Sequence, residues 1–269
     1  MTAAPTASAS PMTPNAAVIE RAATGSAFVF SAHIGANDRC FAQLMSLHVP
    51  EGATVADVTH GRGNFWKRVP PGKYDVKATD LADGVDCRKL PYGDETIDAV
   101  VLDPPYVAGF FRPRKVGEAY QDFTHRYSAN FEEDGPRYHD GVLALYRDAA
   151  KEAWRVLKPA GKLVLKCQDE VHAGRQYLTH IEIVNDLDTQ YHAKDLFVVV
   201  RNGGNFATRG RAKRARQHHA RKNHSYFLVF EKRAMNTPNT EPHRTPDRPR
   251  AGGTCEGDGS ASESGGHHE

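Results

Sequence analysis

A short apolar run that ends on an acid, two prolines and a tyrosine contains the residues best suited to chemistry. Residues 99–102 are all apolar, which is typical of a buried strand, and Asp103, Pro104, Pro105 and Tyr106 follow directly. Proline cannot continue a strand ladder, so the strand must end there, with Asp103 and Tyr106 at its carboxyl tip. Ligands of open α/β sheets bind at such tips.

Two segments upstream have a similar character. Residues 54–57 form a run that ends on Asp57, and two glycines spaced as G-x-G follow, which predicts a tight turn where the backbone can approach a ligand. Residues 74–80 are a second short strand ending on Asp80, whose carboxylate could accept both hydroxyls of a ribose. Each is also compatible with a plain surface turn. Their succession, continued by Asp86, favours a nucleotide-like pocket.

Two further segments are suited to a polyanionic partner. Residues 107–138 form a long irregular insertion that mixes aromatic and cationic side chains, which suits base stacking and phosphate contact. The alternative is an insertion whose aromatic rings pack on the body of the domain. Residues 201–224 carry many cations and no acid, which predicts a positive patch for nucleic acid or, alternatively, a solubilising loop. The candidate contacts are Arg112, Arg114, Lys115, Arg209, Arg211, Lys213, Arg214 and Arg216.

The elements that must position these residues alternate between strands and helices. Apolar spacing predicts helices over 139–157 and 174–187, and a helix from Asn37 or Asp38 to about Pro50. Residues 162–167 predict another strand. Two late strands, 196–200 and 226–230, have no clear helix between them, which predicts an antiparallel pair closing one edge of the sheet.

Composition limits the chain to one sizeable domain or two small ones. The chain has 269 residues and 29.7 kDa, and we expect disordered tails over 1–16 and 234–269 around an ordered body at 17–233. No run is long enough for a membrane helix, and no signal peptide is evident at the start. The cysteines are scattered and no metal-ligand spacing occurs, so we expect reduced thiols, no metal and a cytoplasmic location.

Taken together, the motifs resemble a known family. Residues 57–65, the Asp103–Tyr106 motif, residues 155–166 and residues 224–232 are similar to class I S-adenosylmethionine-dependent DNA amino-methyltransferases of the D-P-P-Y type, which methylate adenine N6 or cytosine N4. The resemblance covers about residues 28–233. It implies a Rossmann-like α/β fold, with a mostly parallel twisted sheet, an antiparallel edge hairpin and helices on both faces.

The resemblance also implies roles for individual residues. Asp103, Pro104, Pro105 and Tyr106 would hold the target amine and its base. Residues contacting S-adenosylmethionine would be Phe30, Asp57, Thr59, Gly61, Gly63, Asp80, Asp86 and Cys87. Many relatives carry a target-recognition domain after the last strand. Here only a tail follows, so recognition would come from 107–138 and 201–224.

The first position of the D-P-P-Y motif bears on the target base. Cytosine-N4 enzymes of the family more often have serine at the first motif position, so Asp103 favours adenine N6 of DNA. Cytosine N4 of DNA and guanine N2 of RNA stay open as alternatives. An interpretation of another class is a non-catalytic nucleic-acid-binding subunit, which would be expected to lack the glycine turn or the D-P-P-Y motif; both are intact.

Overall fold

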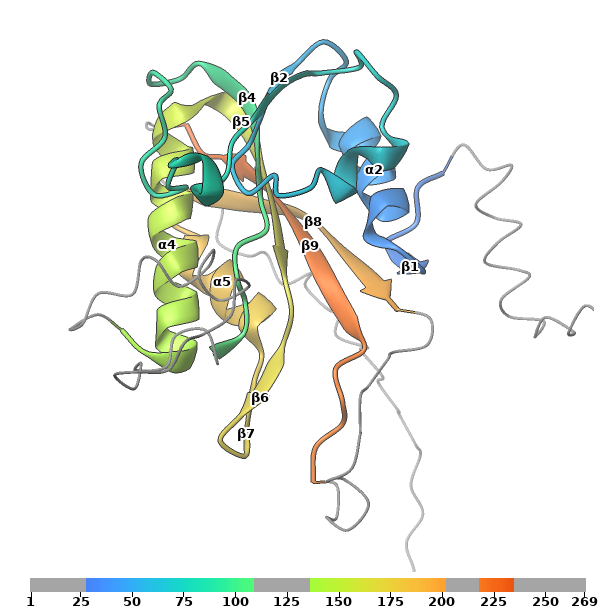
Figure 1. Cartoon of the computed structure of the whole chain (residues 1–269), viewed down its shortest axis with the longest axis vertical. Helices are drawn as coiled ribbons and strands as arrows, with labels where there is room; N and C mark the ends of the chain where they lie inside the picture. The colour runs from blue at the N-terminus through green and yellow to red at the C-terminus, as the bar shows by residue number, and fades with distance from the viewer. Residues whose placement is uncertain (1–27, 109–135, 202–217, 235–269) are drawn as a thin grey trace, which may run out of the picture. The chain divides into compact units, whose positions relative to one another are not determined.

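The computed structural model describes residues 28–108, 136–201 and 218–234 (Figure 1). Within these ranges, seven strands form one sheet in the order β1-β8-β9-β5-β4-β2-β3, and β6 pairs with β7 in a separate hairpin. The strands are β1 (Ala32–Ile34), β2 (Thr54–Asp57), β3 (Asp75–Ala78), β4 (Ile97–Leu102), β5 (Leu157–Cys167), β6 (Glu170–His172), β7 (Arg175–Tyr177), β8 (Tyr191–Val200) and β9 (His224–Lys232). The helices are α2 (Asn37–His48), α4 (Tyr138–Val156) and α5 (Thr179–Leu187), with short 3₁₀ helices η1 (Asn64–Arg68) and η2 (Leu81–Asp83).

The sheet is mixed. Strands β3, β2, β4 and β5 are parallel, β9 runs antiparallel between β5 and β8, and β1 is parallel to β8. The predicted antiparallel pair is confirmed as β8 and β9, and the three-residue strand β1 extends the sheet beyond it. The carboxyl ends of β2, β3, β4 and β5 therefore meet at one edge of the sheet, where ligands bind in open α/β folds.

Helices cover both faces of the sheet, as expected (Figure 1). Alternate residues of β4 point to opposite faces, so Val100 and Leu102 join a core with α4 and α5, while Ala99 and Val101 join a core with α2. Strand β4 is buried from both sides, which accounts for its unbroken apolar sequence.

The helix predictions were correct except for the N-cap of α2 and the start of α5. Helix α4 lies within one residue of its predicted range, and α2 begins at Asn37, although its N-cap is Ala36 with no side-chain cap. The predicted helix over 174–187 is wrong in its first turn, because residues 175–177 form β7 and α5 begins only at Thr179. Ala173 (φ 48°) and Gly174 (φ 76°) both have left-handed backbone, which reverses the chain into a hairpin instead.

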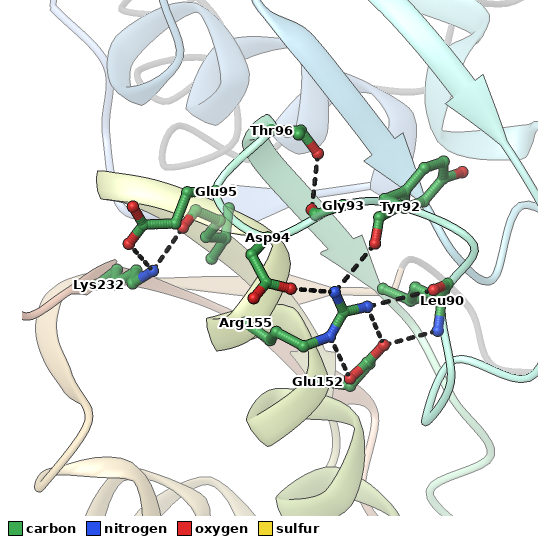
Figure 2. A network of polar contacts seen from close by, with 10 residues as sticks. Leu90, Tyr92, Gly93, Asp94, Glu95, Thr96, Glu152, Arg155 and Lys232 are labelled. Atoms are coloured by element: carbon green, nitrogen blue, oxygen red, sulfur yellow. Dashed lines mark hydrogen bonds and ion pairs between the residues drawn. The ribbon is translucent and has the colours of Figure 1, made fainter.

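A polar network fixes the segment that precedes β4 (Figure 2). The guanidinium of Arg155, near the end of α4, donates to the carbonyls of Leu90 (3.2 Å) and Tyr92 (3.0 Å). It also contacts Asp94 at 2.6 Å and Glu152 at 2.6 Å. One helix residue thus holds the entry to β4 in place, and β4 carries Asp103 at its other end.

No helix among the described residues is long and apolar enough to cross a membrane. The tails expected to be disordered, 1–16 and 234–269, lie outside the described residues except for Ala234.

Candidate functional site at the carboxyl edge of the sheet

Asp57 shapes the glycine-containing loop after β2. Its side chain is 4% exposed, and it accepts hydrogen bonds from Trp66 Nε1 at 2.7 Å, His60 Nδ1 at 3.0 Å and the Thr59 N–H at 3.3 Å. The hydrogen bond to Asp57 raises the pKa of His60 despite its partial burial. Asp57 was predicted to contact a cofactor, and its observed contacts give it the further role of holding the loop that would do so.

The loop itself needs its glycines. Gly61 (φ 52°) and Gly63 (φ 65°) both have left-handed backbone, which glycine adopts without steric cost. A Cβ atom at Gly63 would lie 2.9 Å from His60 Nε2, and that ring is held by Asp57. The prediction of a tight turn at G-x-G is confirmed. Its two backbone N–H groups are hydrogen-bonded within the protein, that of Gly61 to Asp80 and that of Gly63 to the carbonyl of His60.

Asp80 links the first two loops of the site. Its carboxylate accepts the Gly61 N–H at 2.9 Å and, as the N-cap of η2, the Ala82 N–H at 3.0 Å. A carboxylate has about four lone-pair positions, so two remain for further donors such as hydroxyls. The structure therefore brings Asp80 next to the glycine turn. Its contact with ribose hydroxyls stays a prediction.

Asp86 and Cys87, which follow η2, are engaged with the protein. Asp86 forms an ion pair with Arg88 at 2.9 Å and also accepts the Arg88 N–H. Burial opposes the charge of Asp86, but these contacts with Arg88 prevail and lower its pKa. The Cys87 side chain is partly buried and packs against the core cluster that includes α4, and burial raises its pKa to about 12, which favours the protonated thiol.

Phe30 lies just before β1 and is 50% exposed. Its neighbour Val29 packs against the same core cluster as Phe65 and Trp66 of the loop after β2. The cofactor contact of Phe30 stays a prediction.

The D-P-P-Y motif leaves β4 beside a buried lysine. Pro104 is buried, and Asp103 and Tyr106 are partly exposed. Lys166 Nζ lies 3.2 Å from Asp103 Oδ1 and 3.2 Å from the Tyr106 hydroxyl oxygen. The Asp103 N–H donates to Thr59 Oγ1 at 2.7 Å, so the loop after β2 and the loop after β4 are directly joined.

Burial and the neighbouring charges act in opposite directions on the pKa values of Asp103 and Lys166. Burial prevails at Asp103 and raises its pKa; Lys166 and Arg201 act against this rise, and the nearby Asp57 adds to it. Burial of Lys166 favours its neutral form, but Asp103 and Tyr106 outweigh this and raise its pKa. An ionised carboxylate with one oxygen held by Lys166 can still accept a hydrogen bond from a ligand amine.

A second set of side chains anchors the chain beyond Tyr106. The Ala108 N–H donates to Glu170 Oε2 at 2.9 Å, and Glu170 Oε1 lies 3.1 Å from His139 Nδ1. His139 is 4% exposed, and its Nε2 lies 3.1 Å from Glu182. Residues of β6, α4 and α5 thus fix the loop that carries the D-P-P-Y motif.

Sequence reasoning missed the roles of Lys166, His139 and Glu170. The one available signal was Lys166 itself, because a cation inside the apolar run of β5 needs a buried partner. The predicted nucleic-acid contacts lie outside the described residues: Arg112, Arg114, Lys115, Arg209, Arg211, Lys213, Arg214 and Arg216. Within the part of the chain that is described, no group of three or more metal-ligating side chains is suited to an ion.

Comparison with solved structures returns matches at low sequence identity. TrmN from Thermus thermophilus is 17% identical, with 72% of this chain and 48% of that chain covered and a TM-score of 0.42. TTHA0409, also from Thermus thermophilus and in complex with S-adenosyl-L-methionine, is 13% identical, with 70% and 59% covered and a TM-score of 0.36. The cytosine-N4-specific PvuII DNA methyltransferase is 14% identical, with 55% and 47% covered and a TM-score of 0.37.

The chain spans about half the length of these solved proteins, between 47% and 59%. No curated protein sequence matches it. A family model described as DNA methylase matches residues 97–256, which is more than half of the chain and includes the whole D-P-P-Y motif. The chain therefore belongs to the DNA methylase family of N6 and N4 amino-methyltransferases.

Proposed function

We propose that this protein transfers a methyl group from S-adenosylmethionine to an exocyclic amine of a DNA base, most specifically N6 of adenine. The observation that carries the proposal is the placement of Asp103 and Tyr106 at the tip of β4, joined through Thr59 to the glycine loop after β2. A carboxylate acceptor and an aromatic ring lie on one side of that junction, and the loop suited to a nucleoside-like donor lies on the other.

The residues present fit the cofactor. Asp80 has acceptor capacity left for hydroxyl groups, and the backbone of the loop at Gly61 and Gly63 carries no side chain that would block a ligand. When bound, S-adenosylmethionine supplies an electrophilic methyl group on a sulfonium. All other work falls to the chain itself, which must hold the amine and exclude water.

The chemical difficulty lies in the amine. Its lone pair is delocalised into the base, so it is a poor nucleophile until its N–H groups are held by acceptors. Asp103 Oδ2 and the carbonyl of Pro104 are the acceptors at the end of β4, and the Tyr106 ring offers a stacking surface worth about 1–3 kcal/mol. Catalysis is then mainly positioning and desolvation. A base in a duplex must first be flipped out of the stack.

The test is methyl transfer from labelled S-adenosylmethionine to DNA, followed by chromatography of the nucleosides. N6-methyladenine is the expected product, and Asp103→Ala is expected to reduce its formation at least 100-fold while cofactor binding by calorimetry changes little. The Glu231→Gln variant, on β9 and paired with Lys162, serves as a carboxylate control away from Asp103.

Each product has a definite meaning. N4-methylcytosine would keep the chemistry and change the base, and methylguanine in RNA but not in DNA would overturn the proposed substrate. Full activity of Asp103→Ala would contradict the assigned role of the motif.

A further inference from the structure

Lys166 lies beside Asp103 because of the register of two strands. The parallel pairing of β4 with β5 places Leu102 opposite Leu165, so the next residues, Asp103 and Lys166, are also neighbours. The side chain of Lys166 is 3% exposed, and that of Asp103 is 25% exposed. Burying an ammonium group is costly unless its charge is paired, so this lysine depends on what surrounds it.

The surroundings are the two polar side chains of the D-P-P-Y motif. The Lys166 ammonium donates to Asp103 Oδ1 and to the Tyr106 hydroxyl, both at 3.2 Å. It also lies 4.6 Å from the centroid of the Tyr106 ring and 5.9 Å from that of Phe65. One cation thus fixes the carboxylate and the ring of the motif relative to each other.

The charges facing Asp103 come from β2, from β5 and from the residue that follows β8. Asp57 on β2 is of like sign, while Lys166 on β5 and Arg201, which follows β8, are of opposite sign; Tyr106 adds a neutral hydroxyl. Of these two cations, Lys166 is the one within hydrogen-bond distance of the carboxylate. Without it, burial and Asp57 would both favour a protonated Asp103, and a protonated carboxyl is a poorer acceptor for an amine.

We propose that Lys166 is a positioning residue for the methyl transfer, which orients Asp103 and Tyr106 and keeps Asp103 ionised so that Oδ2 can accept the target amine. This inference rests on the proposed function. The transfer forms an N–C bond, breaks the C–S bond with its electron pair going to sulfur, and releases one proton from the amine. Ionised Asp103, which would hold the amine N–H, is the proposed acceptor for that proton, and Lys166 stays protonated throughout.

The first test is the pH profile of kcat/KM for DNA in three variants. Lys166→Met, which removes the charge, is expected to lower kcat/KM at least 10-fold at pH 7 and to move the acidic limb up by about one pH unit. Lys166→Arg is expected to keep the limb near the wild-type position. Lys162→Met, which breaks an ion pair with Glu231 on the neighbouring strand β9, is the matched control and should leave the profile unchanged.

The Kd of S-adenosylmethionine, measured by calorimetry, is expected to stay within twofold of the wild-type value in Lys166→Met. This control shows that the site is folded, since a misfolded site would lose the cofactor as well. A wild-type pH profile and rate in Lys166→Met would overturn the inference. So would an unshifted acidic limb accompanied by a merely lower rate, since a purely structural role predicts that result.

A second measurement needs neither a folded variant of Lys166 nor methylation activity. Carbon NMR of the wild-type protein with labelled aspartate, assigned through Asp103→Asn, should show the Asp103 carboxyl ionised at pH 7. A protonated Asp103 at pH 7 would contradict the inference even if Lys166→Met did not fold. If the wild-type protein failed to methylate DNA, the proposed function would fail, whereas a protonated Asp103 in this titration would contradict the inference about Lys166.

Discussion

At Gly63, both the backbone conformation and the space available for a side chain disfavour any residue other than glycine. Its φ of 65° disfavours other residues, and a Cβ there would lie 2.9 Å from the His60 ring. Gly72 has a similar φ of 75°, but a Cβ there would have no neighbour within 4 Å. A comparison of alanine substitutions at Gly63 and Gly72 therefore separates the cost of backbone strain from that of a steric clash.

We expect Gly72→Ala to destabilise the protein by about 1–2 kcal/mol through left-handed backbone alone. Gly63→Ala should cost more, because the ring of His60 must move and its hydrogen bond to Asp57 is then disturbed. Urea unfolding measures both changes, and calorimetry with S-adenosylmethionine should show weaker binding for Gly63→Ala only. Equal losses in the two variants would show that the contact with His60 is immaterial.

At the scale of elements, the β6–β7 hairpin and helices α4 and α5 meet at His139. Its ring bridges Glu170 of β6 and Glu182 of α5, and it stacks on Tyr177 of β7 with 4.0 Å between ring centroids. Burial disfavours the charged ring, but the hydrogen bonds to Glu170 and Glu182 prevail and raise the pKa of His139.

A pKa that is higher in the folded state than in the unfolded state determines how the stability of the protein changes with pH. The stability contributed by protonated His139 is fully present below the unfolded pKa of 6.5, and it is lost as pH rises through the higher folded value. We expect the difference in Tm between wild type and His139→Gln to be largest near pH 6 and to shrink towards pH 8.5. Thermal melts over that range measure it, with exposed His192→Gln as the control. A difference independent of pH would rule out a charged His139.

Across the whole molecule, the sequence predicted the elements better than their contacts. The apolar runs of β4 and β5 and the helical spacing of α4 were enough to place these elements, because each buries a continuous face. The D-P-P-Y motif and the acids at strand ends also lie where the α/β pattern predicted them. The three-residue strands β6 and β7 were missed because so short a segment has no measurable period.

The contacts within the site were harder to predict. Lys166 lies 63 positions from Asp103 and Glu170 lies 31 from His139, so only the register and the packing of distant elements bring them together. The carboxylates of Asp57 and Asp80 were assigned to a ligand from their positions. Their hydrogen bonds to Trp66 and Gly61 depend on a loop conformation that composition does not specify.

The hydrogen bond from the Asp103 N–H to Thr59 Oγ1 has a thermodynamic consequence. It joins the loop suited to the methyl donor to the loop suited to the amine, so ordering one loop reduces the entropy still to be lost by the other. Linkage is reciprocal, so for the proposed substrate DNA would tighten the binding of S-adenosylhomocysteine by the same factor by which S-adenosylhomocysteine tightens the binding of DNA.

We expect that factor to be about 5-fold or more in the wild type and in Thr59→Ser, and to fall towards one in Thr59→Val, which lacks the hydroxyl. Calorimetric titrations with and without the second ligand measure it, and undiminished coupling in Thr59→Val would refute this route. If the coupling is lost in Thr59→Val, the 2.7 Å contact, already made in the free protein, is the route by which each ligand favours the binding of the other.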